Sequence, residues 1–328
     1  MADLTAYHAW LDSLPDNQGF RQISPVRPYA HAEEAYDAQY GSEAEHAPEG
    51  VGLCELLRQR GVDLAGPALE IGCGTGYLTT GLALSGRLPA LLVTDPSLAF
   101  LRLTERRLKG REQPPGSVRY AVLNGDDLGR VPAAMFSLIA LRSTLHHILD
   151  VDTFLGTCAR ALRPGGVLAL SAEPCDEGYV LMGAVAHAIP TTLRAAGVTL
   201  TPEWEHQIRN FCATMQFYSR RDVDKTAAED KHLFRLYELA VMGSRHGLRF
   251  DFHPNAAYES FAPGQQPPAS GTFENFFPAY LRYCMSFDPA LVALIQTHLR
   301  EQMAYIDACY PTHAGPLFNG VYLFTRSA

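Results

Sequence analysis

The 328-residue chain has no apolar run that approaches the ~20 residues a helix needs to cross a bilayer. Its first stretch, MADLTAYHAWLDSLPD, carries acidic residues and a broken apolar pattern, unlike a secretory signal peptide. The seven cysteines are scattered and form no Cys-x-x-Cys pair, so neither a disulfide framework nor a structural zinc site is indicated. These absences predict a cytoplasmic protein without a membrane partner.

Positive charge is also scarce. The chain has 27 Lys and Arg against 35 Asp and Glu, a formal net charge of −8, and it lacks the basic run typical of nucleic-acid binders. Twelve histidines are present, but no His-x-x-x-His pair supports a metal site. We therefore expect no nucleic-acid partner and no bound metal.

Short apolar runs alternate with helical patterns between about residues 50 and 172, which is typical of parallel βαβ units. After residue 174 the pattern is mostly helical, with strand-like runs returning at 248–253 and 317–326. This predicts an α/β fold with one doubly wound sheet and two helical insertions. The expected units are an N-terminal helical lid segment (1–50), a sheet core (51–174, 233–253 and 317–328) and two insertions that form a cap over the site (175–232 and 254–316).

A glycine-rich stretch, ALEIGCGTGYLTTGLALSG (68–86), follows the pattern of strand, loop and helix. This arrangement brings backbone N–H groups to a ligand at a helix N-terminus. The glycines at 72, 74 and 76 give G-x-G-x-G rather than the G-x-G-x-x-G of dinucleotide-binding proteins, which disfavours a dehydrogenase. Taken alone, the stretch is also compatible with a simple tight turn.

Acidic residues end the next two expected strands. Asp95 lies where a carboxylate could accept both hydroxyls of a ribose, or could only cap the following helix. Asp126 and Asp127, in NGDDL (124–128), could accept from an adenine amino group or only form a turn. Because strand carboxyl ends line the crevice of an open α/β sheet, the three features together favour a nucleotide-like ligand.

The order and spacing of these motifs resemble the class I S-adenosylmethionine-dependent methyltransferases. The resemblance covers about residues 65–173. The motifs that carry it are LEIGCGTG (69–76), VTDPS (93–97), NGDDL (124–128), LHHILD (145–150) and LRPGGVLALS (162–171).

The resemblance implies a seven-stranded Rossmann-like sheet whose last strand, supplied by LFNGVYLFTR (317–326), runs antiparallel to the others. It implies S-adenosyl-L-methionine as the cofactor, with Asp95 at the ribose and both Asp126 and Asp127 facing the adenine. The methionine part would be surrounded by Glu70, Gly72, Gly74 and Gly76. The charge of Glu70 agrees with this, because a carboxylate opposes a diphosphate and suits an ammonium and a sulfonium.

Candidate catalytic residues follow the fourth and fifth expected strands. His147 is the better candidate for a general base and His146 the second, because imidazole titrates near neutrality. Glu173 and Asp176 could orient an acceptor amine or hydroxyl. Each of these residues could instead be structural: the histidines could pack or line the site, and the acids could cap or be solvated.

Other positions extend or depart from the family pattern. Tyr36 and Tyr40, in AYDAQYG (35–41), are candidates for a lid over the cofactor. Arg142 points toward the cofactor or an acceptor carboxylate, unless it is a packing arginine. Ser137 stands where the family often has an acid, and we expect it to serve structure.

These patterns predict an enzyme, a methyltransferase of class EC 2.1.1 that acts on a small-molecule acceptor in a specialised biosynthetic pathway. The alternatives are an RNA or protein methyltransferase and a non-catalytic S-adenosylmethionine-binding protein, since binding and catalysis need the same loop. A homodimer and the identity of the methylated atom (O, N, C or S) stay open.

Overall fold

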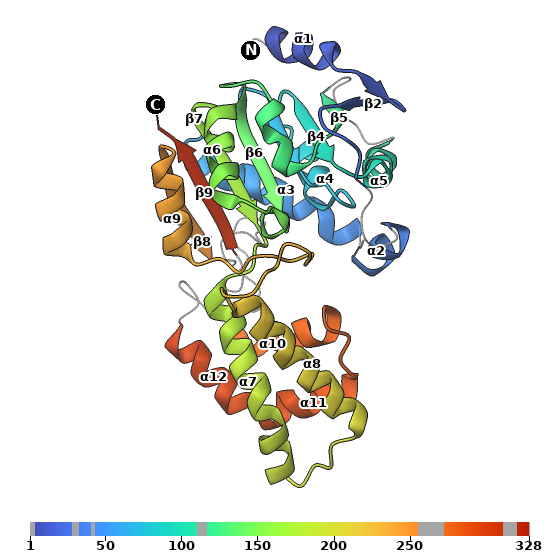
Figure 1. The fold of residues 1–328 in the computed structure, drawn as a ribbon, viewed down its shortest axis with the longest axis vertical. Helices are drawn as coiled ribbons and strands as arrows, with labels where there is room; N and C mark the ends of the chain where they lie inside the picture. The colour runs from blue at the N-terminus through green and yellow to red at the C-terminus, as the bar shows by residue number, and fades with distance from the viewer. Residues whose placement is uncertain are drawn as a thin grey trace.

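The computed structural model describes residues 4–27, 33–40, 43–109, 117–254, 272–310 and 320–327. It has two lobes, one built around a sheet and one made of helices (Figure 1). No helix in these ranges is long and apolar enough to cross a membrane.

The sheet has nine strands in the order β1-β2-β5-β4-β3-β6-β7-β9-β8. The strands from β2 to β7 in this order are parallel, and β9 runs antiparallel to both β7 and β8. The strands are β1 (Asp16–Asn17), β2 (Phe20–Gln22), β3 (Ala68–Ile71), β4 (Leu91–Asp95), β5 (Val118–Val122), β6 (Phe136–Arg142), β7 (Leu162–Ser171), β8 (Leu248–Pro254) and β9 (Gly320–Arg326).

The predicted α/β class and the antiparallel last strand are confirmed, but the predicted count of seven strands is wrong. The two extra strands, β1 and β2, come from the N-terminal segment expected to be helical, and β2 pairs with the edge strand β5. They are two and three residues long, too short to produce an alternating pattern.

The central strands are apolar because both sheet faces are covered. One face packs against α3 (Glu43–Gln59), α4 (Tyr77–Leu84) and α5 (Leu98–Leu108), and the other against α1 (Thr5–Ser13), α6 (Val151–Ala161) and α9 (Leu236–Arg245). Every residue of β3 and β4 is buried. Ser137 is buried within β6, where its hydroxyl donates to the Gly66 carbonyl at 2.9 Å, in keeping with a structural role.

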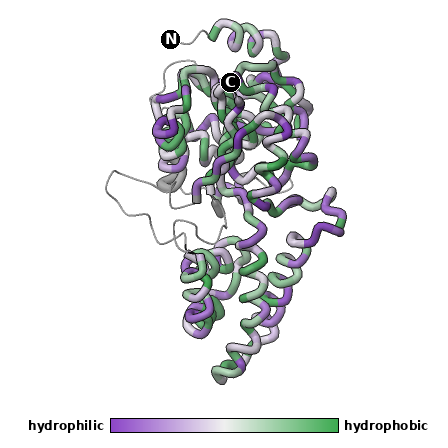
Figure 2. The backbone as a smooth tube through the Cα atoms, turned by 90° about the vertical axis from the view of Figure 1, so that its left-hand side faces the viewer, coloured by the Kyte–Doolittle hydropathy of each residue, from purple (hydrophilic) through white to green (hydrophobic). Residues whose placement is uncertain are grey.

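The helical lobe has a hydrophobic core of its own, which includes Phe211, Phe277 and Ile295. Figure 2 shows this lobe standing apart from the sheet lobe. Its helices are α7 (Asp176–Ala195), α8 (Pro202–Ser219), α10 (Phe273–Tyr283), α11 (Pro289–His298) and α12 (Arg300–Cys309). They fall in the two stretches predicted as insertions; residues 255–271 and 311–319 lie outside the described ranges.

The carboxyl edge of the parallel strands faces the helical lobe, since β7 leads directly into α7 (Figure 1). After α8, a non-helical return segment (residues 220–235) runs back to this edge. It is anchored by the Phe234 amide, which donates to the Pro174 carbonyl at 2.9 Å, and by the Lys231 amide, which donates to the His146 carbonyl at 2.8 Å.

Candidate functional site

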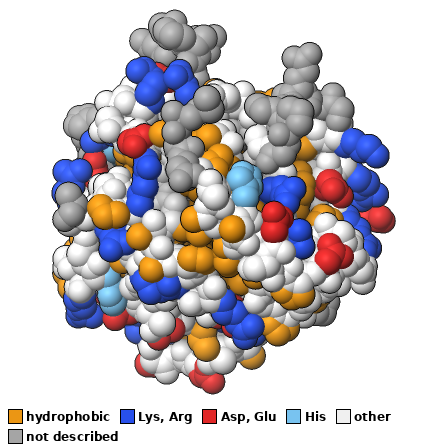
Figure 3. Space-filling model, turned by 90° about the horizontal axis from the view of Figure 1, so that it is seen from above, with side chains coloured by type: hydrophobic (Ala, Val, Ile, Leu, Met, Phe, Trp, Pro, Cys, Tyr) orange, Lys and Arg blue, Asp and Glu red, His pale blue; other side chains and the backbone are white. Residues whose placement is uncertain are grey.

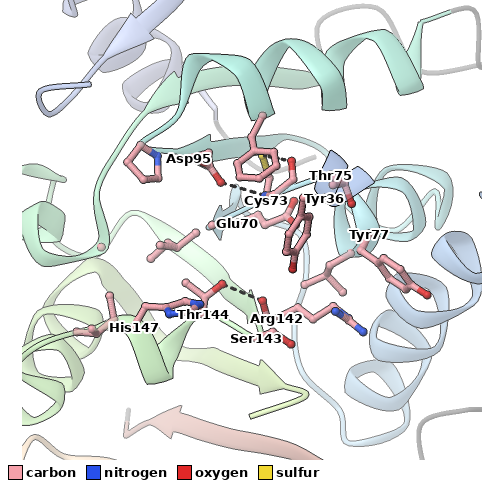
Figure 4. Close-up of a pocket in the computed structure, with 18 of the residues that line it drawn as sticks. Tyr36, Glu70, Cys73, Thr75, Tyr77, Asp95, Arg142, Ser143, Thr144 and His147 are labelled. Atoms are coloured by element: carbon pink, nitrogen blue, oxygen red, sulfur yellow. Dashed lines mark hydrogen bonds between the residues drawn. The ribbon is translucent and has the colours of Figure 1, made fainter. Parts of the chain in front are cut away.

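A cavity of about 820 Å³ opens at the carboxyl ends of β3, β4 and β6. A volume of this size is typical of a cofactor or substrate site. Short helix α2 (Glu33–Tyr40) contributes Tyr36 to its wall, and the end of α10 contributes Tyr283 and Cys284. Figure 4 shows residues from the glycine loop and from the end of β6 around the same space.

In the loop after β3, Gly72 is required because a side chain would collide with a neighbouring residue, whereas Gly74 has open space beside it and a positive φ. Gly72 has a φ of +73°, and a Cβ there would lie 2.6 Å from the Thr144 hydroxyl, so a side chain is excluded. Gly74 has a φ of +50°, and a Cβ there would meet no described atom within 4 Å. The loop therefore presents bare backbone to the cavity, as expected for a ligand cradle.

Glu70 is a buried carboxylate on the cavity wall, 1% exposed, and its Oε2 has no hydrogen-bond partner among the described residues. Burial, with Asp95 nearby, raises its pKa to about 8. A buried carboxyl group with one oxygen that lacks a partner fits a ligand carrying positive charge, and S-adenosylmethionine carries an ammonium and a sulfonium. The residues present therefore fit this cofactor.

Asp95, at the end of β4, is buried and lines the cavity. Its Oδ2 accepts from the Gly74 amide at 3.0 Å and its Oδ1 from the Ser97 amide at 2.8 Å. These two bonds hold the carboxylate against the glycine loop. Its role at the ribose remains a prediction.

Asp126 and Asp127 do not lie on the cavity wall; Asn124 and Gly125 of the same turn do. Asp126 accepts from the Leu149 amide at 3.4 Å, and Asp127 lies 3.7 Å from Arg130. The Asn124 Nδ2 is buried without a partner among the described residues. Contact of the two aspartates with adenine stays a prediction, and Asn124 is the residue that the sequence analysis missed.

His147 lines the cavity from the loop after β6 (Figure 4). Its Nδ1 lies 3.0 Å from the Glu229 carbonyl, which can only accept, so Nδ1 carries the proton and Nε2 keeps its lone pair. Burial, and then the positive charge of His146, lower the pKa of His147. His147 is therefore neutral at physiological pH.

His146 and Glu173 lie behind the cavity wall. Glu173 is fully buried and accepts from the Thr144 and Leu145 amides at 2.7 Å each and from His146 Nδ1 at 2.7 Å. Burial alone would lower the pKa of His146, but the carboxylates of Glu173 and Asp230 raise it to about 10. Burial alone would raise the pKa of Glu173, but the positive charge of His146 and the hydrogen bonds from His146 and the backbone lower it. At neutral pH the pair is ionised.

Glu173 holds a strained turn. Ser143 and Ala172 have φ values of +46° and +53°, a conformation that costs energy in residues other than glycine. The buried carboxylate binds three successive backbone amides from Thr144 onward, which fixes the loop that carries His147.

Asp176, the other acid expected to orient an acceptor, does not line the cavity either. It pairs with Arg235 at 2.6 Å.

His146, His147 and Asp230 form the one described group of side chains able to hold a metal ion, with ligand atoms within 4.8 Å of one another. Both ring nitrogens of His146 already have partners, because Nδ1 lies 2.7 Å from Glu173 and Nε2 lies 3.4 Å from Asp230. A proton on His146 thus compensates both carboxylates. The expectation that the protein uses no metal remains a prediction, and turnover after chelator treatment checks it.

Arg142 and Tyr36 lie on the cavity wall, as the sequence analysis expected, although neither role is tested. The Arg142 Nε donates to Glu49 at 2.8 Å, and its guanidinium lies 4.2 Å from the centre of the Tyr77 ring. The side chain of Tyr40 is outside the described residues.

The sequence matches a family model described as a methyltransferase domain over residues 69–168. It is 31% identical to a ubiquinone biosynthesis O-methyltransferase from Xanthomonas oryzae pv. oryzae over 185 residues, which covers 55% of this chain and 74% of that protein. It is 27% identical to reducing polyketide synthase Preu2 from Preussia isomera over 152 residues, 43% of this chain and 6% of that protein.

A chain from the complex between a Haloferax volcanii methyltransferase activator and a methyltransferase shares the fold, with a TM-score of 0.53 and 14% identity over 92% of this chain and 100% of that one. The chain belongs to the class I S-adenosylmethionine-dependent methyltransferases. S-adenosylmethionine is its cofactor.

Proposed function

We propose that this methyltransferase transfers the methyl group to a small-molecule acceptor in a specialised biosynthetic pathway, and that His147 takes the proton that the acceptor loses. One observation carries the proposal: a neutral imidazole, with the tautomer fixed by the Glu229 carbonyl, lines the same cavity as Glu70 and Asp95. A residue in this state is suited to act as a base for a hydroxyl or amine.

The cofactor supplies an electrophilic methyl group on a sulfonium, so the protein mainly has to align the acceptor. A pKa of about 8 keeps Glu70 protonated at neutral pH, and a positively charged ligand favours its ionised form, which then balances that charge. Asp95 holds the glycine loop in position. Glu173 acts as a positioning residue, because it holds the backbone of the His147 loop rather than facing the cavity.

Three observations support a small acceptor over a macromolecule. Tyr283 at the end of α10 and Cys284 directly after it line the cavity, which supports the proposal that the helical lobe covers a small acceptor there. The net charge is −8 and the sequence has no basic run. At the end of the molecule away from the helical lobe, basic side chains are interspersed with acidic ones (Figure 3). The relatives are named for ubiquinone biosynthesis and polyketide synthesis.

A test compares wild type with His147→Ala on a panel of phenol, amine and carboxylic-acid acceptors. Loss of His147 should lower kcat ~100-fold or more while the affinity for S-adenosylhomocysteine stays unchanged. Unchanged turnover across pH 6–9 would show that alignment alone suffices. Methylation of RNA or protein, without turnover of any small molecule, would favour the alternative function.

A further inference from the structure

Helix α2 lies beside the cofactor cavity with few buried contacts. Of its described side chains, residues 34–38, none is fully buried; Tyr36 and Asp37 are half-buried and the others are exposed. Tyr36 lines the cavity and meets the Phe100 ring edge-to-face at 5.8 Å. Because so little apolar surface anchors α2, its polar contacts matter for its position.

Arg107, near the end of α5, connects α2 to the glycine loop. One guanidinium nitrogen lies 2.8 Å from the Asp37 carboxylate, and the other donates to the Thr75 carbonyl between Gly74 and Gly76. The side chains of Arg107 and Asp37 are only 12% and 23% exposed. The planar fork of arginine can serve both partners at once, which the single ammonium of lysine does less well.

We propose that the Asp37–Arg107 pair is a latch that holds α2 closed over the bound cofactor and ties this closure to the shape of the glycine loop. The proposal rests on the cofactor site described above and adds two positioning residues to it. A ligand that contacts both the loop and Tyr36 favours the closed arrangement, and the latch in turn slows release of that ligand.

The latch is electrostatic, so its strength depends on salt. Partly buried pairs are screened less than exposed ones, but at ~1 M salt, where the Debye length is ~3 Å, part of the attraction is lost. Any effect of removing Asp37 should therefore shrink at high salt. An effect caused by lost packing would not shrink in this way.

The test measures S-adenosylhomocysteine affinity by calorimetry and its dissociation rate by stopped flow, in the full chain. Asp37→Ala should raise the dissociation rate about fivefold. Glu34→Ala is the matched control, because it removes an exposed carboxylate from the same helix and should change neither quantity. Melting temperatures without ligand establish that each variant is folded.

Arg107→Ala, alone and combined with Asp37→Ala, gives a double-mutant cycle for the pair. If the latch exists, Asp37→Ala has no further effect on dissociation in the Arg107→Ala background. Equal effects of Asp37→Ala in both backgrounds, or no effect in wild type, would overturn the latch. Absence of S-adenosylhomocysteine binding to wild type would instead overturn the assignment of the cavity to the cofactor.

Discussion

His146 and His147 are adjacent but carry different charges at neutral pH. The carboxylates of Glu173 and Asp230 keep His146 protonated, whereas His147 is half-buried beside that positive charge and donates to a neutral carbonyl. We propose separate roles for the two histidines: His146 belongs to the ionic network, and His147, which lines the cavity, acts as the base.

The pH profile of turnover tests this division. Because the pKa of His147 is lowered from its ordinary 6.5, the base stays neutral to a lower pH, and kcat should fall only on the acid side of 6.5. The profile of His147→Ala should lack this acid limb. An acid limb centred above pH 7 in wild type would contradict the assignment.

Stability at alkaline pH tests the state of His146. Its pKa is raised from 6.5 to about 10, so its contribution to the free energy of unfolding is complete below pH 6.5 and is lost as pH rises through about 10. Denaturant titrations between these values should show wild type and His146→Gln converging as pH rises. A constant difference would show that His146 is not protonated in the native state.

In the glycine loop, we expect Gly72 to be required mainly for stability and Gly74 mainly for binding of the cofactor. Gly72→Ala should destabilise the protein by ~2 kcal/mol or more, because its Cβ collides with Thr144 at a positive φ. Gly74→Ala costs mainly the strain of its φ, ~1 kcal/mol, but its methyl projects into space that the cofactor would use. In melting curves, Gly72→Ala should lose more stability than Gly74→Ala, and in titrations with S-adenosylhomocysteine, Gly74→Ala should lose more affinity among folded protein. The same order in both measurements would contradict this account.

The parts of the site that follow strand ends could be predicted from sequence. Glu70 and Asp95 were found because each occupies a fixed place relative to a glycine loop and a buried strand. In NGDDL, the pattern indicated the turn but not which side chain faces the cavity, and the structure places Asn124 there.

Contacts between distant segments had no sequence signal. Asp230 reaches His146 across more than eighty residues, through a return segment whose path depends on the helical lobe. Arg107 meets Asp37 across seventy residues. Strands β1 and β2 were missed because pairing, of β1 with β2 and of β2 with β5, rather than local pattern makes them strands.

In the whole molecule, the sheet lobe and the helical lobe have separate hydrophobic cores. Phe277→Ala in the helical lobe should destabilise that lobe by ~3–4 kcal/mol, because the ring is fully buried. We expect turnover to fall while S-adenosylhomocysteine affinity changes little, since Glu70, Asp95 and the glycine loop belong to the sheet lobe. Equal losses of both would show that the lobes are coupled. A homodimer remains a prediction.

The most direct test of the account is a calorimetric titration of wild type and Asp95→Ala with S-adenosylhomocysteine, with NAD as the comparison ligand. We expect one S-adenosylhomocysteine per chain, an affinity at least tenfold weaker in Asp95→Ala, and no heat with NAD. Unchanged affinity in Asp95→Ala would contradict the role of Asp95 at the ribose. Binding of NAD without binding of S-adenosylhomocysteine would contradict the assignment of this cavity to the methyl donor.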